Sequence, residues 1–150
     1  MDFKKLANQY KDELLDNVLP FWLKNSQDHE YGGYFTCLDR EGKVFDTDKF
    51  IWLQGREVWM FSMLYNKVEK RQEWLDCAIQ GGEFLKKCGH DGNYNWYFSL
   101  DRSGRPLVEP YNIFSYTFAT MAFGQISLAT GNQEYANIAK KTFEIILSKV

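Results

Sequence analysis

The chain has 150 residues, enough for one ordinary domain or for part of a larger one. Its 18 basic and 20 acidic residues leave a formal net charge of −2, which excludes the broad basic surface of a nucleic-acid-binding protein. Aromatic residues reach 17% of the chain. This content indicates a large core, a surface that stacks on sugars, or both.

The cysteines and the N-terminal segment bear on the cellular compartment. Three cysteines without a CxxC pair argue against a disulfide framework and against a zinc site. The first ten residues are polar and lack the apolar core of a signal peptide. Residues 110–133 carry no charge, but their polar residues favour a buried helix over a membrane span. We therefore expect a cytoplasmic protein with no membrane partner and no nucleic-acid partner.

The first elements are a long helix and a hairpin. Apolar residues recur about every four positions over residues 3–24, which predicts a helix that kinks or breaks at Pro20. A glycine-rich loop follows at 28–33. Residues 34–45 then predict a short β-hairpin, in which Gly42 supplies a positive φ.

The next two helices differ in their hydrophobic pattern. Residues 52–68 are apolar on almost every face, which is typical of a buried helix. Residues 73–88 are amphipathic, and Gly89 suits the C′ position that ends such a helix.

The pattern then repeats after 62 positions, as from Leu38 to Leu100. A second hairpin, a nearly all-apolar helix over 112–129 and an amphipathic helix over 133–150 follow. Alternating buried and amphipathic helices fit two concentric helical layers, as in an α/α toroid. Five helices are two and a half repeats, so we expect residues 1–150 to be the N-terminal part of a single, longer barrel domain.

The most unusual segment is WLQGR at residues 52–56. Arg56 is predicted in the first turn of a buried helix, where a cation opposes the helix dipole and burial without a partner is costly. Gly55 adds about 1 kcal/mol of helix cost. Two local costs at one place indicate a site that binds an anion or oxyanion. The alternative is a structural arginine paired with Glu57 or another carboxylate, and Trp52 is open to either stacking on a sugar or packing in the core.

Other candidate groups have structural explanations. His29 and His90 precede the hairpins at equivalent positions of two repeats, which favours a loop-shaping role over acid–base catalysis. Asp39 and Asp101 are expected to be turn residues. The tryptophans at helical spacing are expected in the core rather than on a sugar: Trp22, Trp59, Trp74 and Trp96.

Three segments together resemble the N-acylglucosamine 2-epimerase family, whose animal members are also called renin-binding proteins. They are LLDNVLPFW at 14–22, GGYFTCLDR at 32–40 and WLQGR at 52–56, in this order. The resemblance implies an all-α fold, an (α/α)6 barrel of about twelve helices with short β-hairpins between them. This chain is expected to cover about five of the twelve helices. It also implies the interconversion of N-acetylglucosamine and N-acetylmannosamine by proton exchange at C2 of the open-chain sugar.

The same resemblance implies roles for particular residues. Arg56 matches the family's active-site arginine, which would stabilise the developing enolate oxygen. Trp52 and Gln54 would line the substrate cleft. Relatives that act on disaccharides carry a tyrosine where we align Phe114, with Tyr116 two positions further on, and we expect both residues to contact substrate. The departure at Phe114 favours the N-acylhexosamine branch.

Cofactors and partners are also implied by the resemblance. Family members need no metal ion, some are stimulated by ATP, homodimers are common, and the animal type binds renin. The family's acid–base histidines lie beyond residue 150, and neither His29 nor His90 matches them. We therefore expect the 150 residues alone to be inactive.

Three other functions stay open at the level of sequence. One is a non-catalytic binding protein or short isoform of the renin-binding type. Another is an epimerase of a different free sugar, such as cellobiose. A glycoside hydrolase or lyase would need two carboxylates across a cleft, and the predicted buried helices offer no convincing pair.

Overall fold

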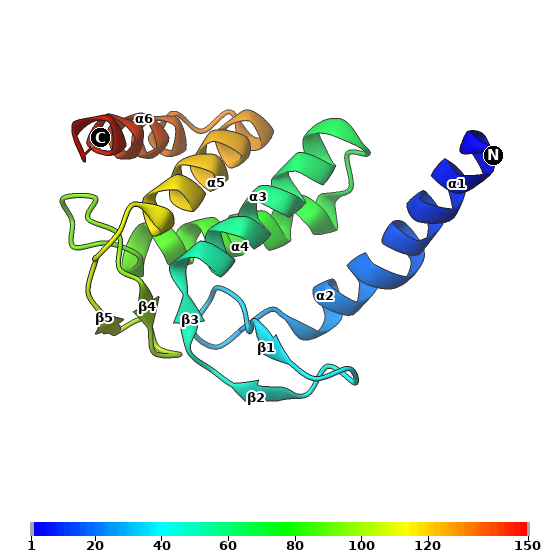
Figure 1. Cartoon of the computed structure of the whole chain (residues 1–150), viewed down its shortest axis with the longest axis horizontal. Helices are drawn as coiled ribbons and strands as arrows, with labels where there is room; N and C mark the ends of the chain where they lie inside the picture. Colours follow the sequence, from blue (N-terminus) through cyan, green and yellow to red (C-terminus); the bar gives the residue numbers. More distant parts are fainter. Residues whose placement is uncertain (1, 150) are drawn as a thin grey trace.

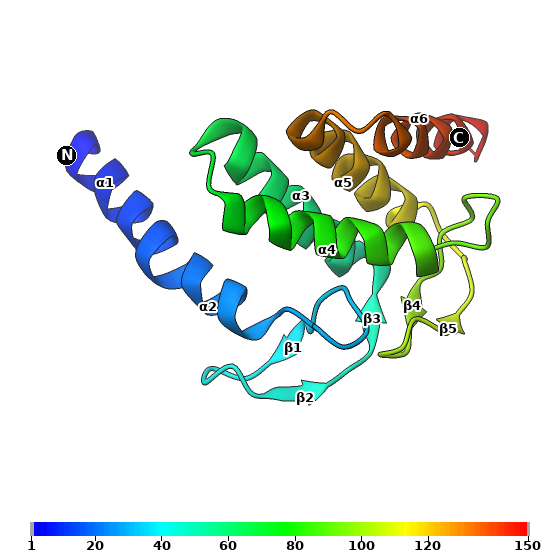
Figure 2. The same cartoon turned by 180° about the vertical axis from the view of Figure 1, so that it is seen from behind.

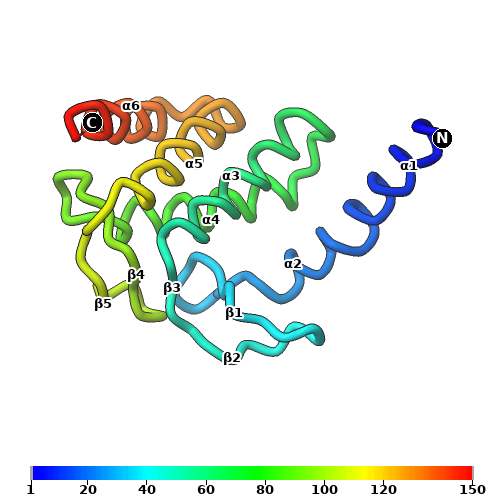
Figure 3. Tube along the Cα trace, viewed as in Figure 1, coloured from blue at the N-terminus to red at the C-terminus, as the bar shows by residue number. Residues whose placement is uncertain are grey.

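A computed structural model of the chain describes residues 2–149. Its elements form an arc with α1 at one end and α6 at the other, so the first and last helices lie far apart (Figures 1 and 3). The helices are α1 (Phe3–Glu13), α2 (Leu19–Asn25), α3 (Ile51–Lys67), α4 (Gln72–Cys88), α5 (Phe114–Thr130) and α6 (Gln133–Lys149). The strands are β1 (Cys37–Leu38), β2 (Val44–Asp46), β3 (Lys49–Phe50), β4 (Ser99–Leu100) and β5 (Pro106–Val108).

The first predicted helix is one continuous rod with a wide turn in its middle. A π-helical turn, η1 (Leu14–Val18), joins α1 to α2. Pro20, in the first turn of α2, lacks an N–H group, and its ring would clash with the carbonyl four residues earlier. The wider turn lies just before Pro20 and accommodates it without a break. The predicted kink at Pro20 is therefore replaced by a π turn on its N-terminal side.

Helices α3 and α5 pack against each other most extensively and form the inner layer. Helix α4 covers α3, and α6 covers α5, on the outer side (Figures 1 and 2). Trp74 and Trp96 are buried in the core between these layers, as predicted, whereas Trp22 and Trp59 are only half-buried. The alternation of inner and outer helices is confirmed, but one face of α3 is more exposed than its all-apolar pattern predicted.

Both predicted hairpins form, and a third strand links them. β1 pairs with β2, β4 pairs with β5, and Gly42 has the expected positive φ of 85°. β3 also pairs antiparallel with β4, with Lys49 opposite Leu100. The resulting sheet, in the order β3-β4-β5, joins the first repeat to the second. The sequence did not predict β3, because a two-residue strand has no readable period.

Two predicted helix ends differ from the structure. Gly89 follows α4 with a φ of −74°, so it is not in the left-handed conformation predicted for it. A Cβ atom at this position would lie 2.7 Å from the Trp96 ring, so the glycine is needed for close packing instead. Helix α5 begins at Phe114 and not at Asn112, because the Asn112 side chain accepts the Phe114 N–H at 2.9 Å and lies outside the helix.

The uncharged stretch from 110 to 133 contains α5, a 17-residue helix of the inner layer. Among residues 2–149, no helix has both the length and the hydropathy needed to cross a membrane.

Candidate functional site

The strands before α3 fix where this helix begins. β3 runs directly into α3, and the Ile51 N–H donates to the Phe98 carbonyl oxygen at 3.0 Å. The residue before the helix makes no side-chain capping bond, so this sheet contact satisfies one of the free N–H groups at the helix start. Trp52, Gln54 and Arg56 therefore project from the first two turns of a helix that is held by the sheet.

Arg56 lies in the second turn of α3 and is exposed, not buried in the first turn as predicted. Among the described residues, its guanidinium takes part in no salt bridge. The alternative of a structural pair with Glu57 is wrong, because the Glu57 carboxyl is hydrogen-bonded to Ser26. The arginine charge is thus available to an anionic group.

Trp52 and Phe114 come from different repeats, and the structure brings them together. Their ring centroids are 5.7 Å apart, and Phe118 contacts both rings at 5.8 and 5.1 Å. Phe114 is 48% exposed and Trp52 is half-buried. These three rings form a partly exposed aromatic wall at the N-terminal ends of α3 and α5, one helical turn before Arg56.

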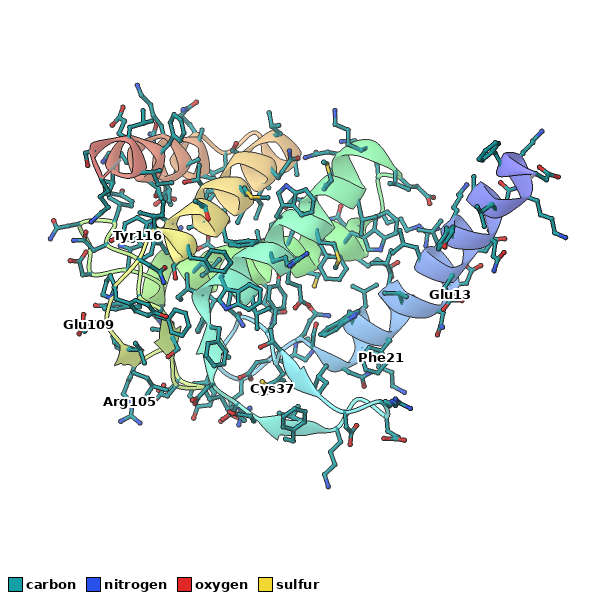
Figure 4. All side chains as sticks on the ribbon, viewed as in Figure 1. Glu13, Phe21, Cys37, Arg105, Glu109 and Tyr116 are labelled. Carbon is teal, nitrogen blue, oxygen red and sulfur yellow. The ribbon has the colours of Figure 1, made fainter. Side chains whose placement is uncertain are left out.

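Gln54 and Tyr116, by contrast, do not lie on this wall. Gln54 is fully buried; its amide group donates to the Tyr34 carbonyl and accepts the Tyr34 N–H, both at 2.8 Å. It therefore clamps the first hairpin onto α3. The Tyr116 hydroxyl donates to Asn95 at 3.2 Å, and its buried ring lies on the side of α5 that faces α6 (Figure 4).

Gln54 and Tyr116 are buried away from the wall for a simple geometric reason, and their substrate contacts stay a prediction. Gln54 follows Trp52 by two positions, and Tyr116 follows Phe114 by two positions. On an α-helix, two positions correspond to a rotation of about 200°, so each side chain points away from the wall.

A cavity of about 390 Å³ adjoins Arg56, between α2, the first hairpin and α3. Its lining is mostly apolar, and Glu57 is its one acidic residue. The lining residues are Trp22, Thr36, Leu53, Arg56, Glu57, Trp59 and Met60.

Glu57 is 8% exposed, and burial raises the pKa of its carboxyl to about 8. The geometry around Ser26 agrees with a neutral carboxyl. The Ser26 Oγ lies 2.7 Å from the Trp22 carbonyl oxygen and 2.5 Å from Glu57 Oε1. A hydroxyl has one proton and the carbonyl only accepts, so both contacts are satisfied when Ser26 donates to Trp22 and protonated Glu57 donates to Ser26.

A buried ionic cluster lies near the same end of α3. Lys49 is fully buried and donates to Asp28 at 2.9 Å, to the Gly32 carbonyl at 2.6 Å and to the Arg102 carbonyl at 2.8 Å. The Arg102 side chain donates to both Asp28 oxygens, at 3.0 and 3.1 Å. Burial alone would raise the pKa of Asp28, but the bonds from Arg102 and Lys49 hold it at about 2.

This cluster joins three loops and strands that are far apart in the sequence, and sequence reasoning missed it. Its one local signal is a lysine directly before the apolar residues Phe50 to Leu53. That signal does not identify the partners.

The remaining candidate residues shape turns and loops. His90 accepts the Gly92 N–H through Nδ1 at 3.0 Å, and its ring stacks on Tyr94. Asp39 and Asp101 accept backbone N–H groups within their own hairpin turns, as expected. Among residues 2–149, no group of three or more His, Cys, Asp or Glu side chains is arranged to hold a metal ion.

Comparison with known proteins identifies the family. Residues 33–150 match the sequence profile of N-acylglucosamine 2-epimerase (GlcNAc 2-epimerase). The chain belongs to the N-acylglucosamine 2-epimerase family. It is 43% identical to the N-acylglucosamine 2-epimerase of Bos taurus over 148 residues, which is 91% of this chain and 33% of the relative. The human enzyme is 42% identical over 145 residues, 89% of this chain and 32% of the relative.

The chain thus spans about a third of the length of these family members. Among solved structures, the cellobiose 2-epimerase of Bacillus thermoamylovorans B4167 matches with a TM-score of 0.87 and 29% identity, over 95% of this chain and 37% of that one. The expected fold class, an (α/α)6 barrel with short hairpins between its helices, is confirmed by this match. In this chain, the wall and Arg56 lie near the ends of α3 and α5 that follow the hairpins.

Proposed function

We propose that this protein is a sugar 2-epimerase that interconverts N-acetylglucosamine and N-acetylmannosamine. The observation that carries the proposal is the exposed Arg56, which has no carboxylate partner among the described residues and lies one turn from an aromatic wall. The chain's identity of 41–43% to mammalian N-acylglucosamine 2-epimerases supports the same activity.

In the proposed reaction, a base removes the C2 proton of the open-chain sugar, and the electron pair moves onto the carbonyl oxygen. The Arg56 guanidinium stabilises the negative charge on that oxygen, which is an electrostatic effect on the transition state. Trp52 and Phe114 pack against the apolar face of the sugar. An acid then returns a proton to the opposite face of C2, so the step conserves oxidation state and needs no redox cofactor.

The acid and base are not assigned to the histidines of this chain. His90 is held by Gly92 in the loop after α4, and His29 is exposed in the loop before β1. We assign proton exchange to histidines outside residues 1–150, as the family resemblance implies. The free thiols of Cys37, Cys77 and Cys88 support a cytoplasmic location, where such an epimerase would serve amino-sugar and sialic acid metabolism.

A second candidate is a cellobiose 2-epimerase, because solved cellobiose 2-epimerases share the fold with this chain. The identity to such enzymes is lower, for example 31% to that of Ruminococcus albus. Phe114 also stands where we align the tyrosine of relatives that act on disaccharides. Both points support N-acylglucosamine as the substrate.

The test uses the protein at its native full length, with N-acetylglucosamine in D2O and NMR detection. We expect N-acetylmannosamine to form, with deuterium at C2 of both sugars. Arg56→Ala should lower kcat by about a hundredfold or more, as removal of one oxyanion donor does. Arg105→Ala, in a residue whose side chain is 83% exposed, is the matched control.

Retention of more than about a tenth of the wild-type kcat by Arg56→Ala would remove Arg56 from the mechanism. Turnover of cellobiose, but not of N-acetylglucosamine, would favour the second candidate.

A further inference from the structure

We propose that the cavity beside Arg56 receives the N-acyl group of the substrate, and that Glu57 and the apolar lining residues select for this group. The inference rests on the proposed function, because it requires a sugar bound at Arg56. It adds specificity-determining residues to that function.

The position of the cavity follows from the chemistry of the sugar. In an open-chain 2-acylaminosugar, the oxygen that becomes the enolate is on C1 and the acylamino group is on C2. These two groups are on adjacent carbons. A guanidinium that stabilises the C1 oxygen must therefore lie within a few ångströms of the acylamino group, and Arg56 is itself part of the cavity lining.

The lining suits an acyl group in both shape and polarity. Leu53, Met60 and the rings of Trp22 and Trp59 surround the space with apolar surface. At about 390 Å³, the cavity lies within the range of small-molecule sites, about 300–1,000 Å³. It has room for acyl chains longer than acetyl.

Glu57 provides the polar contact that an amide needs. Its Oε1 is bonded to Ser26, whereas its Oε2 has no hydrogen-bond partner within residues 2–149. With the proton on Oε1, as the Ser26 geometry indicates, Oε2 is a neutral acceptor for the amide N–H. A neutral acceptor binds this group without placing a negative charge next to the developing enolate.

The experiment uses the full-length protein and measures kcat and KM for 2-epimerisation of N-acetyl-, N-propanoyl- and N-butanoylglucosamine. The wild type should accept all three sugars, with KM values within about threefold of one another. Glu57→Leu should raise KM for every acylaminosugar by about fivefold to tenfold, as the loss of one hydrogen bond does, and leave kcat nearly unchanged. Glu57→Gln keeps an acceptor oxygen and should restore the wild-type KM.

Met60→Trp tests the shape of the cavity independently of Glu57. The larger side chain should exclude the butanoyl and propanoyl sugars, with at least a tenfold greater loss of kcat/KM than for the acetyl sugar. Glu73→Leu on exposed α4 surface and Met121→Trp, at a position 42% exposed on α5, are the matched controls. Circular dichroism and Tm establish that each variant is folded. If Glu57→Leu does not fold, the Met60→Trp result alone tests the inference.

In an active Met60→Trp variant, equal losses of kcat/KM for all three acyl lengths would overturn the inference and leave the proposed function intact. The cavity would then be filled by the protein itself. A Glu57→Leu variant with wild-type KM would overturn the role of Glu57. A folded wild type that epimerises none of the three sugars would overturn the proposed function and the inference together.

Discussion

Arg56 and Glu57 are adjacent in the chain, but their side chains lie in opposite environments. One is charged and exposed, and the other is buried against Ser26. A carboxylate beside Arg56 would compete with the enolate for the guanidinium. Glu57 is not such a competitor, because its carboxyl is buried and bonded to Ser26.

The raised pKa of the Glu57 carboxyl predicts that the stability of the protein depends on pH. The pKa of Glu57 is about 8 in the folded protein and 4.5 in its ordinary state, so the folded protein holds the proton more tightly. The resulting stabilisation is fully present below pH 4.5 and is lost as pH rises through 8. Glu57→Gln has no such proton, so at pH 8 it should be more stable than the wild type by about 4 kcal/mol relative to their difference at pH 4.5.

Urea unfolding of both proteins between pH 4.5 and pH 8.5 measures this difference. The gap in free energy of unfolding should widen with pH. A gap that stays constant across this range would mean that Glu57 is already ionised in the folded protein. Glu73→Gln on exposed α4 surface should show no widening.

Among the secondary-structure elements, the start of α3 is held in place by groups from three separate segments. Gln54 binds the backbone of the first hairpin, β3 pairs with the second hairpin, and Lys49 ties Asp28 to the Arg102 carbonyl. The wall and Arg56 are therefore positioned by buried polar contacts as well as by apolar packing. This arrangement explains why a short strand and a buried lysine precede the site.

Removing the lysine should test that arrangement. Lys49→Met keeps most of the side-chain volume but removes one partner of a buried ion pair, so it should destabilise the protein by about 3 kcal/mol. In a double-mutant cycle, Asp28→Asn should cost less in the Lys49→Met background than alone. Lys43→Met, at an exposed position of the first hairpin, is the control. Additive effects of the two substitutions in urea unfolding would show that the pair is not coupled.

The sequence predicted the elements better than the contacts between them. Hydrophobic periodicity is a local property, and it predicted α3, α4, α5 and α6 to within two residues at each described end. The Lys49 cluster was missed because its partners are 21 and 53 positions away. At the site, Trp52 and Phe114 do meet. Gln54 and Tyr116 are close to these residues in the sequence, but the helix turns them to the opposite face.

For the whole molecule, the outstanding feature is the apolar stripe on the rod formed by α1 and η1. The rod extends away from the other helices (Figure 2), and α1 has no buried residue. Phe3 is 75% and Tyr10 70% exposed, and Leu6, Leu14 and Val18 continue the same stripe. Contiguous apolar surface of this kind is unusual on a monomeric protein and indicates a surface that is covered by other protein.

We therefore expect the polypeptide 1–150, expressed alone, to self-associate through this stripe. Sedimentation velocity should show species larger than 17.7 kDa, and 1-anilinonaphthalene-8-sulfonate should bind. Tyr10→Glu and Leu14→Glu together should shift the distribution toward the monomer, because burying two unpaired carboxylates in an apolar contact is costly. The control substitutions Asn8→Glu and Asp12→Asn, at exposed polar positions of α1, should leave the size distribution unchanged. A sharp, monomeric, two-state unfolding transition of the unsubstituted polypeptide would contradict the prediction, because it would show that the stripe is stable in water without a covering surface.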